Sequence, residues 1–463
     1  MNDCFADQPS EYFLANGCFA HHLPVGDLEA LQLAALQQRF AAMRDRIPPL
    51  TALADAARLD EIRGLTDGAL LLFPHTLYKS YPAALLDELR FPELTEWLTR
   101  LTTIDLSRVK GRQFSAIDHW FDVLDAETEL DVVTSSGTTE LLSIIPRAKR
   151  DGSEQARNAL LCWNYPDSSL PVHERTMPFA LIWLGYESGR SVNFRSARVL
   201  REIYTGRNRG FIPLIPAHFS TDWQYFVTKT AAADVRNLAP PPMSSYVEAR
   251  FAEARVIRET LNERTRQVLE LIRDQFHHER LNVNGATPVL FDVAKQGLEM
   301  GMERALAPGS IVSTGGGLKN AAIAGDPHDV IRRFGGVSQI DEHYGMTELR
   351  DSFKKCEHGR FHIWPWVIPY LFDIEGNELL PSGSLQRGRL GLFDLSAATR
   401  WGGVTTGDCV TLSRGQCPCG GLTPQIIPPI ERIRTRPRVE HVLGGPSPAA
   451  IGMAIGALNA ELG

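Results

Sequence analysis

The spacing of apolar positions predicts helices in the N-terminal part of the chain. Between residues 27 and 46, apolar side chains recur at roughly helical spacing, and the two prolines that follow are expected to end this helix. A second helical pattern runs from residue 53 to residue 63 and stops at Gly64. The segment 70–82 mixes apolar, aromatic and basic residues with two prolines. We interpret it as an irregular loop that either anchors these helices or contacts a substrate.

From residue 130 onward, strand-like segments alternate with helical ones. Apolar runs predict buried strands at residues 130–133, 179–184, 211–215 and 310–313. A long amphipathic pattern predicts a helix from residue 245 to residue 277, with Ser245 and Glu248 as its capping box and Val256 on its buried face. This alternation is typical of an α/β fold with sheets flanked by helices.

Length and charge exclude several classes of protein. The chain has 463 residues, of which 43% are hydrophobic and 22% charged, as in a soluble globular protein with a large core divided into subdomains. A net charge of −7 and the lack of a dense Lys/Arg run argue against nucleic acid as a partner. No uninterrupted apolar stretch approaches the length of a membrane span, and the N-terminal sequence does not resemble a signal peptide. We therefore expect a cytoplasmic protein.

A hydroxyl-rich segment follows the strand predicted at residues 130–133. It reads Thr134-Ser135-Ser136-Gly137-Thr138-Thr139. Its hydroxyls and exposed backbone N–H groups suit an anion such as a triphosphate, although no Walker lysine follows. A Ser/Thr-rich surface turn is the alternative interpretation.

Three later motifs have the residue types of a nucleotide site. Gly315-Gly316-Gly317, followed by Lys319, places bare backbone at the carboxyl end of a predicted strand, where nucleotides bind in open α/β sheets. Tyr344-Gly345-Met346-Thr347-Glu348 offers a ring for a base, a hydroxyl for phosphate and a carboxylate for Mg²⁺. Thr405-Thr406-Gly407-Asp408 offers a carboxylate for a ribose diol. A tight turn is the alternative for the glycines.

Four of the seven cysteines lie between residues 356 and 419, which favours a metal site over a disulfide framework. Cys356 and His362 lie six positions apart, and Cys417-x-Cys419 follows later in the chain. Three thiolates and one imidazole fit a closed, structural zinc site. His358 is the competing imidazole.

In this order, the four nucleotide motifs resemble those of the adenylate-forming superfamily of acyl- and aryl-CoA synthetases, luciferases and adenylation domains. Within it, three segments look most like the acyl-protein synthetases of bacterial bioluminescence and the phenylacetate–CoA ligases: Gly315–Lys319, Cys356–His362 and Cys417–Gly420. The resemblance implies the large N-terminal domain of that α/β fold, with mixed sheets flanked by helices. Its parts are expected at residues 1–128 (helical), 129–432 (nucleotide-binding core, with a zinc-binding subregion at 356–420) and 433–463 (a short remnant in place of the mobile C-terminal domain).

The resemblance also implies a role for each motif residue. The phosphate loop would comprise Ser135, Ser136, Gly137, Thr138 and Thr139. The remaining cofactor contacts would come from Gly315, Gly316, Gly317, Tyr344, Gly345, Thr347, Asp408 and the hinge residue Arg432. Glu348 would bind Mg²⁺, and the expected catalytic residues are Thr138, Thr347, Glu348 and Lys319.

The implied reaction is the ATP- and Mg²⁺-dependent conversion of a fatty or aromatic carboxylic acid to its acyl-adenylate, with release of pyrophosphate. The acyl group would then pass to a protein, amine or thiol acceptor. The alternatives are an acyl- or aryl-CoA ligase and a non-catalytic scaffold in a biosynthetic complex. The expected partners are a small-molecule carboxylic acid and an acyl-accepting protein, and a homodimer is considered. Aromatic residues in segments 73–81 and 114–120 and at Trp163 line either the acid pocket or the core.

Three departures from the superfamily pattern concern charge. Glu140 stands where the phosphate loop usually ends in glycine, and a carboxylate beside a triphosphate is unfavourable unless it points away or meets the metal. Ser143 stands near the place of a loop lysine, and no lysine follows Arg432. The superfamily's C-terminal catalytic lysine is therefore expected to be dispensable or supplied by another protein, and Lys319 is expected to supply part of the positive charge.

Overall fold

The structure is a computed structural model that describes residues 5, 7–15, 20–135, 141–163, 178–206, 208–317, 323, 325–376, 378–433 and 448–460. The chain divides into two compact units. Unit 1 comprises Met1–Ser135, Leu141–Pro171 and Met346–Gly463, and unit 2 comprises Ser136–Glu140 and Val172–Gly345. The domain boundaries expected after residues 128 and 432 stay predictions.

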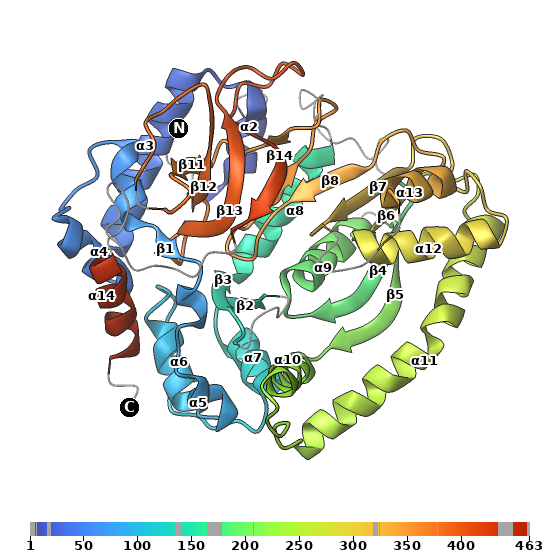
Figure 1. Ribbon diagram of the computed structural model, residues 1–463, viewed down its shortest axis with the longest axis horizontal. Coiled ribbons are helices and arrows are strands. Elements are labelled where there is room, and N and C mark those ends of the chain that lie inside the picture. Colours follow the sequence, from blue (N-terminus) through green and yellow to red (C-terminus); the bar gives the residue numbers. More distant parts are fainter. Residues whose placement is uncertain are drawn as a thin grey trace. The chain divides into compact units, whose positions relative to one another are not determined.

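The N-terminal part of unit 1 is helical, as the sequence predicts (Figure 1). The helices of this unit are α2 (Pro9–Ala15), α3 (Val25–Met43), α4 (Pro48–Ala57), α5 (Ala83–Asp87), α6 (Phe91–Thr99), α7 (Ile117–Glu127), α8 (Lys149–Trp163) and α14 (Pro448–Asn459), with the 3-10 turns η1 (Ala20–His22), η2 (Leu65–Leu71) and η3 (Leu77–Lys79). The bounds predicted for the second helix were wrong. α4 begins at Pro48 because the first turn of a helix accepts proline, and it ends before Arg58, whose φ is +56°.

Two sheets are present among the described residues of unit 1. The larger one follows the order β10–β14–β13–β12–β11, and β1 pairs in parallel with β13. Its strands are β1 (Phe73–Pro74), β10 (Phe361–His362), β11 (Val367–Phe372), β12 (Leu385–Asp394), β13 (Gly403–Ser413) and β14 (Gln425–Arg432). The smaller sheet is the antiparallel pair β2 (Leu130–Thr134) and β3 (Ile144–Ala148). Every residue of β2, β3 and β11 is buried, so these strands belong to the core.

Aromatic side chains fill the interior of this unit. Trp97, Trp120, Trp366 and Trp401 are among its largest fully buried side chains. The Trp401 indole donates to the Leu71 carbonyl at 2.7 Å, which satisfies its polar group inside the core. Among the aromatic residues considered for an acid pocket, the structure buries Phe73, Tyr78, Tyr81 and Trp120. Their burial favours the core interpretation.

Unit 2 contains parallel strands in the order β5–β4–β6–β7–β8. The strands are β4 (Ala180–Gly189), β5 (Gly210–Phe219), β6 (Leu281–Ala286), β7 (Ile311–Gly315) and β8 (Asp341–Tyr344), and the helices are α9 (Val192–Thr205), α10 (Thr221–Val235), α11 (Ser245–Asp274), α12 (Thr287–Glu299) and α13 (Pro327–Gly335). Strands β2, β4, β5 and β7 form where the apolar runs predict strands, but β5 is not buried as predicted, since Leu214 is its one buried residue. Helices connect the strands, as parallel pairing requires.

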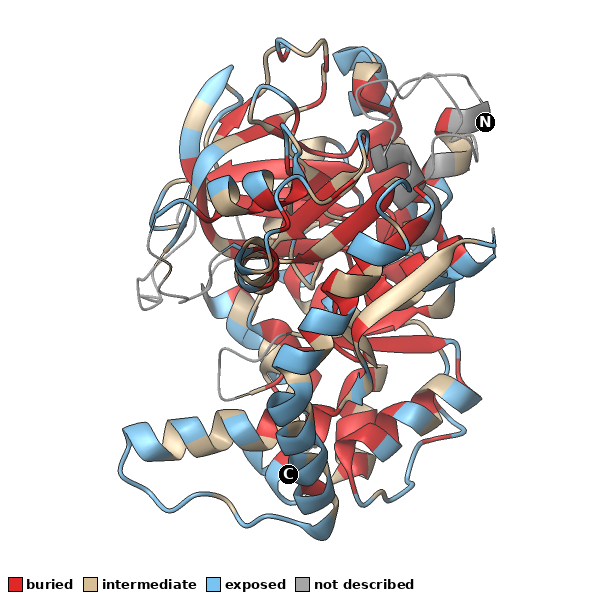
Figure 2. Cartoon of the chain, turned by 90° about the vertical axis from the view of Figure 1, so that its right-hand side faces the viewer, coloured by how far each residue is buried: buried red, intermediate tan, exposed pale blue. Residues whose placement is uncertain are grey.

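Helix α11 matches the predicted helix, with two corrections. The capping residue is Ser244, whose hydroxyl accepts a hydrogen bond from the Val247 N–H at 3.3 Å, and not Ser245. Val256 is 54% exposed, because α11 buries mainly the later part of its apolar stripe, at Val268, Leu269 and Ile272 (Figure 2). No described helix is both long and apolar enough to cross a bilayer.

Candidate functional site

The hydroxyl-rich segment begins at the last residue of β2, Thr134, as its sequence position predicts. The Ser135 N–H donates to the Ser143 carbonyl at 3.3 Å, and the Ser135 hydroxyl accepts from the Ser143 N–H at 3.4 Å. These bonds extend the β2–β3 pairing by one residue. Beyond the described residues lie Ser136, Gly137, Thr138, Thr139, Glu140 and Lys319.

The glycine motif of unit 2 lies at the carboxyl end of a parallel strand, where the sequence places it. β7 ends at Gly315, which pairs with His343 of β8. A side chain at Gly315 would meet the His343 carbonyl at 3.2 Å, so glycine permits this close approach. Gly316 and Gly317 follow with φ values of +80° and +60°, which favour glycine, and Tyr344 ends β8. Two neighbouring strands therefore bring the glycines and Tyr344 to one edge of the sheet, where ligands bind in such folds.

In unit 1, Asp408 and Arg432 lie opposite each other on the neighbouring strands β13 and β14. The Arg432 guanidinium donates to the Asp408 carboxylate at 2.7 Å. The Asp408 side chain is 11% exposed and that of Arg432 is 65% exposed. The carboxylate is thus oriented by a cation that stays accessible to solvent, and a carboxylate is an acceptor for hydroxyl donors such as those of a ribose.

Two buried arginines bind the backbone that carries Thr347 and Glu348. Arg147, on β3, donates to the carbonyl groups of Thr347, at 2.9 Å, and of Leu349. Arg400 donates to the Glu348 carbonyl at 2.6 Å. Three consecutive carbonyl groups are therefore held by charge-assisted hydrogen bonds, which restrict the positions of the Thr347 and Glu348 side chains.

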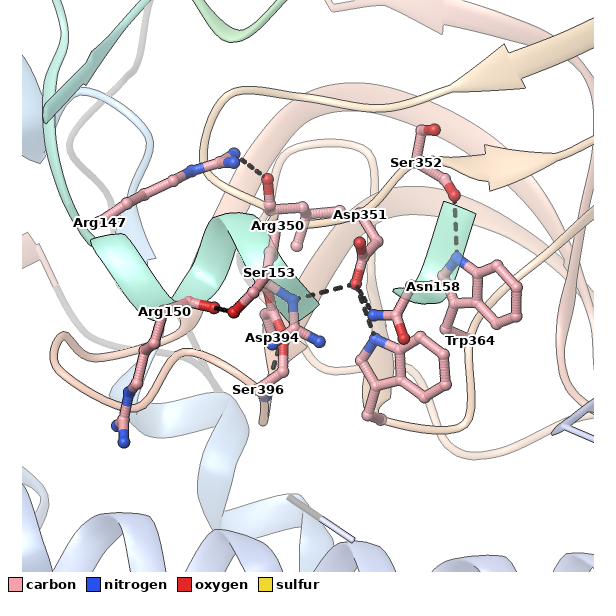
Figure 3. A network of polar contacts seen from close by, with 12 residues as sticks. Arg147, Arg150, Ser153, Asn158, Arg350, Asp351, Ser352, Trp364, Asp394 and Ser396 are labelled. Atoms are coloured by element: carbon pink, nitrogen blue, oxygen red, sulfur yellow. Dashed lines mark hydrogen bonds and ion pairs between the residues drawn. The ribbon is translucent and has the colours of Figure 1, made fainter. Parts of the chain in front are cut away.

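A buried polar network continues behind this segment (Figure 3). The Asp351 carboxylate accepts hydrogen bonds from Asn158 at 2.7 Å, from Trp366 at 3.2 Å and from Arg350 at 3.2 Å. The Arg350 N–H donates to Asp394 at 2.9 Å. Buried charges are tolerated when they are paired in this way, and breaking such a pair is costly. The network therefore gives the 347–349 segment a rigid support.

Lys79 is a candidate functional residue that the sequence interpretation did not single out. It ends η3 directly after Tyr78, whose hydroxyl donates to the carbonyl of Trp401 at 3.2 Å, next to the Arg400 that binds the Glu348 carbonyl. Burial lowers the pKa of the Lys79 ammonium group, the carboxylate of Glu348 opposes this shift, and the nearby Arg432 adds to it. Lys79, Glu348 and Arg432 are therefore close enough to act on one another electrostatically.

The loop that carries Lys79 runs beside the strand that carries Asp408. Phe73 and Pro74 pair in parallel with Val404 and Thr405 of β13, and the His75 N–H donates to the Thr405 carbonyl at 3.2 Å. The prolines of segment 70–82 marked it as an irregular loop. Nothing in its sequence connected it with the Thr-Gly-Asp motif, because this pairing joins residues far apart in the chain.

Glu348 lies among three cations. Burial raises the pKa of its carboxyl group, and Arg400, Arg432 and Arg147 oppose that shift. The carboxyl group therefore binds a proton more tightly than an ordinary glutamate does. A divalent cation that uses this oxygen must displace the proton, as metal ions do at carboxylate ligands.

The structure brings together the four predicted zinc ligands, all in unit 1. The ligand atoms of Cys356, His362, Cys417 and Cys419 lie within 4.8 Å of one another. Cys356 Sγ and Cys417 Sγ are 3.8 Å apart, and Cys419 Sγ is 3.4 Å from His362 Nε2. Zn–S bonds of about 2.3 Å in a tetrahedral site place two sulfurs about 3.8 Å apart, so the residues fit the ion.

Two matching turns hold the thiols. In the first, the Cys356 N–H donates to the Arg360 carbonyl at 2.8 Å and the Gly359 N–H donates to the Cys356 carbonyl at 2.9 Å. In the second, the Cys417 N–H donates to the Gly421 carbonyl and the Gly420 N–H donates to the Cys417 carbonyl, both at 2.8 Å. The glycine at the fourth position of each turn has a positive φ, +75° at Gly359 and +93° at Gly420.

The fold also discriminates between the two candidate imidazoles. His362 is 1% exposed and lies on β10, whereas His358 is exposed and lies 3.6 Å from Glu357. Burial lowers the pKa of His362 to about 4, which keeps its imidazole neutral, the form that binds metals. The neighbouring ring of His21 is 5.2 Å from that of His362 and bonds the Thr423 hydroxyl at 2.8 Å, so a second layer of polar contacts supports the cluster.

No family model matches this chain, and no curated protein sequence does. Solved structures of 2-hydroxyisobutyryl-CoA ligase, however, have a similar fold. One, in complex with 2-HIB-AMP and CoA in the thioesterification state, has a TM-score of 0.52 at 14% identity over 89% of this chain and 70% of that chain. The chain has the fold of this ligase. An open conformation of the same ligase, again with 2-HIB-AMP and CoA, also has a TM-score of 0.52 at 14% identity, over 90% of this chain and 77% of that one.

The fold of 2-hydroxyisobutyryl-CoA ligase is the mixed α/β fold that the four nucleotide motifs predict, so the predicted fold class is confirmed. The finer resemblance to acyl-protein synthetases stays a prediction. At 14% identity, the likeness to 2-hydroxyisobutyryl-CoA ligase concerns the fold, and the chemistry must be argued from the residues themselves.

Proposed function

We propose that this chain uses ATP to activate a carboxylic acid as its acyl-adenylate. In this reaction a carboxylate oxygen attacks the α-phosphorus of ATP, the bond from that phosphorus to the bridging oxygen breaks, and pyrophosphate leaves. The observation that carries the proposal is the charged cluster Lys79, Glu348, Asp408 and Arg432 in unit 1, on a chain with the fold of 2-hydroxyisobutyryl-CoA ligase.

Within unit 1, the cluster suits the sugar and the phosphates of ATP. Asp408 is proposed to accept hydrogen bonds from the ribose hydroxyls, with Arg432 orienting its carboxylate. Glu348 is proposed as a ligand of the Mg²⁺ that accompanies ATP, because carboxylates are hard oxygen ligands. Thr347 and Lys79 are proposed to contact phosphate oxygens. Negative charge that develops on the leaving pyrophosphate is stabilised by such pre-positioned cations.

Within unit 2, the edge formed by Gly315–Gly317 and Tyr344 is proposed to receive the adenine, with the exposed Gly345 beside it. Bare glycine backbone permits close approach of a planar base, and the tyrosine ring offers it a stacking surface. The roles of Ser136, Gly137, Thr138, Thr139 and Lys319 as phosphate contacts stay predictions.

We propose that Cys356, His362, Cys417 and Cys419 bind one structural Zn²⁺. Support comes from the donor set, the spacing of the sulfurs and the two matching turns. The ion would connect the segment from Cys356 to β10 with the segment between β13 and β14, because two of the ligands come from each. It would thereby stabilise the strand that carries Asp408, and no step of the reaction is assigned to it.

The acyl acceptor defines two versions of the proposal. Resemblance of the glycine and cysteine motifs to those of acyl-protein synthetases supports a protein or amine acceptor. The shared fold with 2-hydroxyisobutyryl-CoA ligase supports coenzyme A as the second candidate. Mass spectrometry of reactions that contain acid, ATP and Mg²⁺, with and without coenzyme A, distinguishes them, since only the second candidate predicts an acyl-CoA product.

Pyrophosphate exchange tests the reaction itself. The purified chain is incubated with ATP, Mg²⁺, labelled pyrophosphate and each of a series of fatty, aromatic and hydroxylated acids. We expect acid-dependent incorporation of label into ATP with at least one class of acid. Binding of ATP without exchange for any acid would instead favour the non-catalytic scaffold, the alternative that Glu140 motivates because its carboxylate stands in the phosphate loop.

A further inference from the structure

The last described helix, α14, is part of unit 1 and packs on α4 (Figure 1). Its buried residues Ala450, Ala454 and Leu458 are spaced by four positions and therefore share one face. The alanines let the two helices approach closely. This packing fixes the position of the C-terminal end of α14.

The end of α14 is bonded to two other segments of unit 1. Arg100, which follows α6, donates to the carbonyl groups of Leu458, at 3.0 Å, and of Ala460. Such carbonyls in the last turn of a helix have no partner within the helix, so a cation stabilises them. The Asn459 side-chain amide donates to the Ser80 carbonyl at 2.8 Å. This second bond reaches the loop that carries Lys79.

Ser80 and η3 form one hydrogen-bonded turn. The Ser80 N–H and hydroxyl both donate to the Leu77 carbonyl, at 3.1 Å and 2.8 Å. Fixing the Ser80 carbonyl therefore fixes the backbone from which Lys79 extends. A lysine side chain is long and flexible, so its ammonium group reaches a given ligand atom reliably only when its backbone is well placed.

We propose that α14 is a positioning element of the ATP site and that Asn459 is its positioning residue. Its bond to the Ser80 carbonyl keeps η3 in the conformation from which Lys79 reaches the phosphates. This inference rests on the proposed function, because it takes ATP as the ligand of Lys79. It gives the helix α14, which follows Arg432 in the chain, a defined task, which is to support the loop that follows β1, the strand paired with β13.

Calorimetry with ATP and with adenosine, both in Mg²⁺, tests the inference. Adenosine contains the base and the ribose but no phosphate, so it serves as the matched ligand. We expect Asn459→Ala to weaken ATP binding about fivefold, the effect of one lost neutral hydrogen bond, and to leave adenosine binding unchanged. In a Lys79→Met background the same substitution should have no further effect, because both act through one group. Met453→Ala, on the face of α14 where Met453 is 51% exposed, is the control and should bind as the wild type does.

Three calorimetric results with the variants would overturn the inference: wild-type ATP affinity in Asn459→Ala, equal losses for ATP and adenosine, or full additivity with Lys79→Met. Hydrogen exchange supplies a readout without ligand, since the amides of residues 77–81 should exchange faster in Asn459→Ala than in the wild type. Unchanged exchange would also refute the role of the hydrogen bond between Asn459 and Ser80. If the wild-type chain binds ATP but shows no pyrophosphate exchange, the proposed catalysis is refuted. Weaker ATP binding by Asn459→Ala would in that case still support the positioning role. Wild-type chain that does not bind ATP refutes both.

Discussion

Replacing Asp408 with asparagine separates ribose binding from fold stability. The substitution keeps the size of the side chain and removes its charge. The lost ion pair with Arg432 is half in solvent, since the arginine is 65% exposed, so we expect the free energy of unfolding to fall by about 1 kcal/mol or less. Hydrogen bonds from ribose hydroxyls to a carboxylate contribute about 1.5–3 kcal/mol. ATP affinity should therefore fall roughly 10- to 150-fold, as each 1.4 kcal/mol corresponds to a factor of ten.

The assay compares ATP with 2′-deoxy-ATP and 3′-deoxy-ATP by calorimetry, on wild type, Asp408→Asn and Arg432→Gln. If Asp408 binds the ribose diol, wild type should bind at least one deoxy nucleotide much more weakly than ATP. Asp408→Asn should lose most of that discrimination, because the hydroxyl no longer meets a charged acceptor. Arg432→Gln removes the same ion pair but leaves the carboxylate, so it should keep the discrimination.

Equal loss of ATP and deoxy-ATP affinity in Asp408→Asn would refute ribose recognition by this residue. So would a loss of discrimination in Arg432→Gln as large as that in Asp408→Asn, since the arginine would then be the recognising group. Thermal unfolding of all three proteins must show that the variants are folded before the affinities are compared.

Four further predictions concern the other parts of the site. Cys417→Ser should remove the bound metal and lower Tm by roughly 5 °C or more, whereas Cys409→Ser, the same change at a buried cysteine outside the cluster, should keep one zinc per chain by elemental analysis. Lys79→Met should weaken Mg-ATP binding roughly tenfold or more and leave adenosine binding unchanged, and an equal effect on both ligands would contradict a phosphate contact. Because burial raises the pKa of Glu348, Mg²⁺ affinity should weaken on acidification at a higher pH than for an ordinary glutamate, and Glu348→Gln should abolish this dependence in Mg²⁺ titrations. The raised pKa also links stability to pH, because the folded state holds the Glu348 proton more tightly than the unfolded chain does. The unliganded fold should therefore lose stability as the pH rises through the pKa of Glu348 in the folded state, and Glu348→Gln should remove this loss.

Local pattern was sufficient to predict the strands β2, β4, β5 and β7 and part of the candidate site. β4, β5 and β7 are short apolar runs, and the glycines after β7 follow from the need for bare backbone at that strand end. The cluster of Cys356, His362, Cys417 and Cys419 was also predictable, because cysteine is rare and its spacing is informative. Choosing His362 over His358 from geometry required the fold, which buries one imidazole and exposes the other.

Helix ends were less predictable, because they depend on single residues. α4 begins at proline because the first turn needs no N–H from it, and α11 is capped by Ser244 because that hydroxyl meets the Val247 N–H. Val256 follows the helical period of the core residues in α11 yet is exposed, since periodicity identifies a face but not how much of that face the rest of the chain covers.

The sequence by itself therefore determined the α/β class and the order of the four motifs, and it indicated the three cysteines of the candidate metal cluster, because each of these follows from a local sequence pattern. Only the tertiary structure decided which residues surround Glu348. The Arg147 bond to the Thr347 carbonyl spans 200 positions in the chain, and the Asn459 bond to Ser80 spans 379. Such pairs leave no local periodicity, because they form only after helices and strands have packed and their polar groups must find partners inside the core. Lys79 became a candidate residue for the same reason: its role depends on the pairing of β1 with β13, two segments that share no sequence signal.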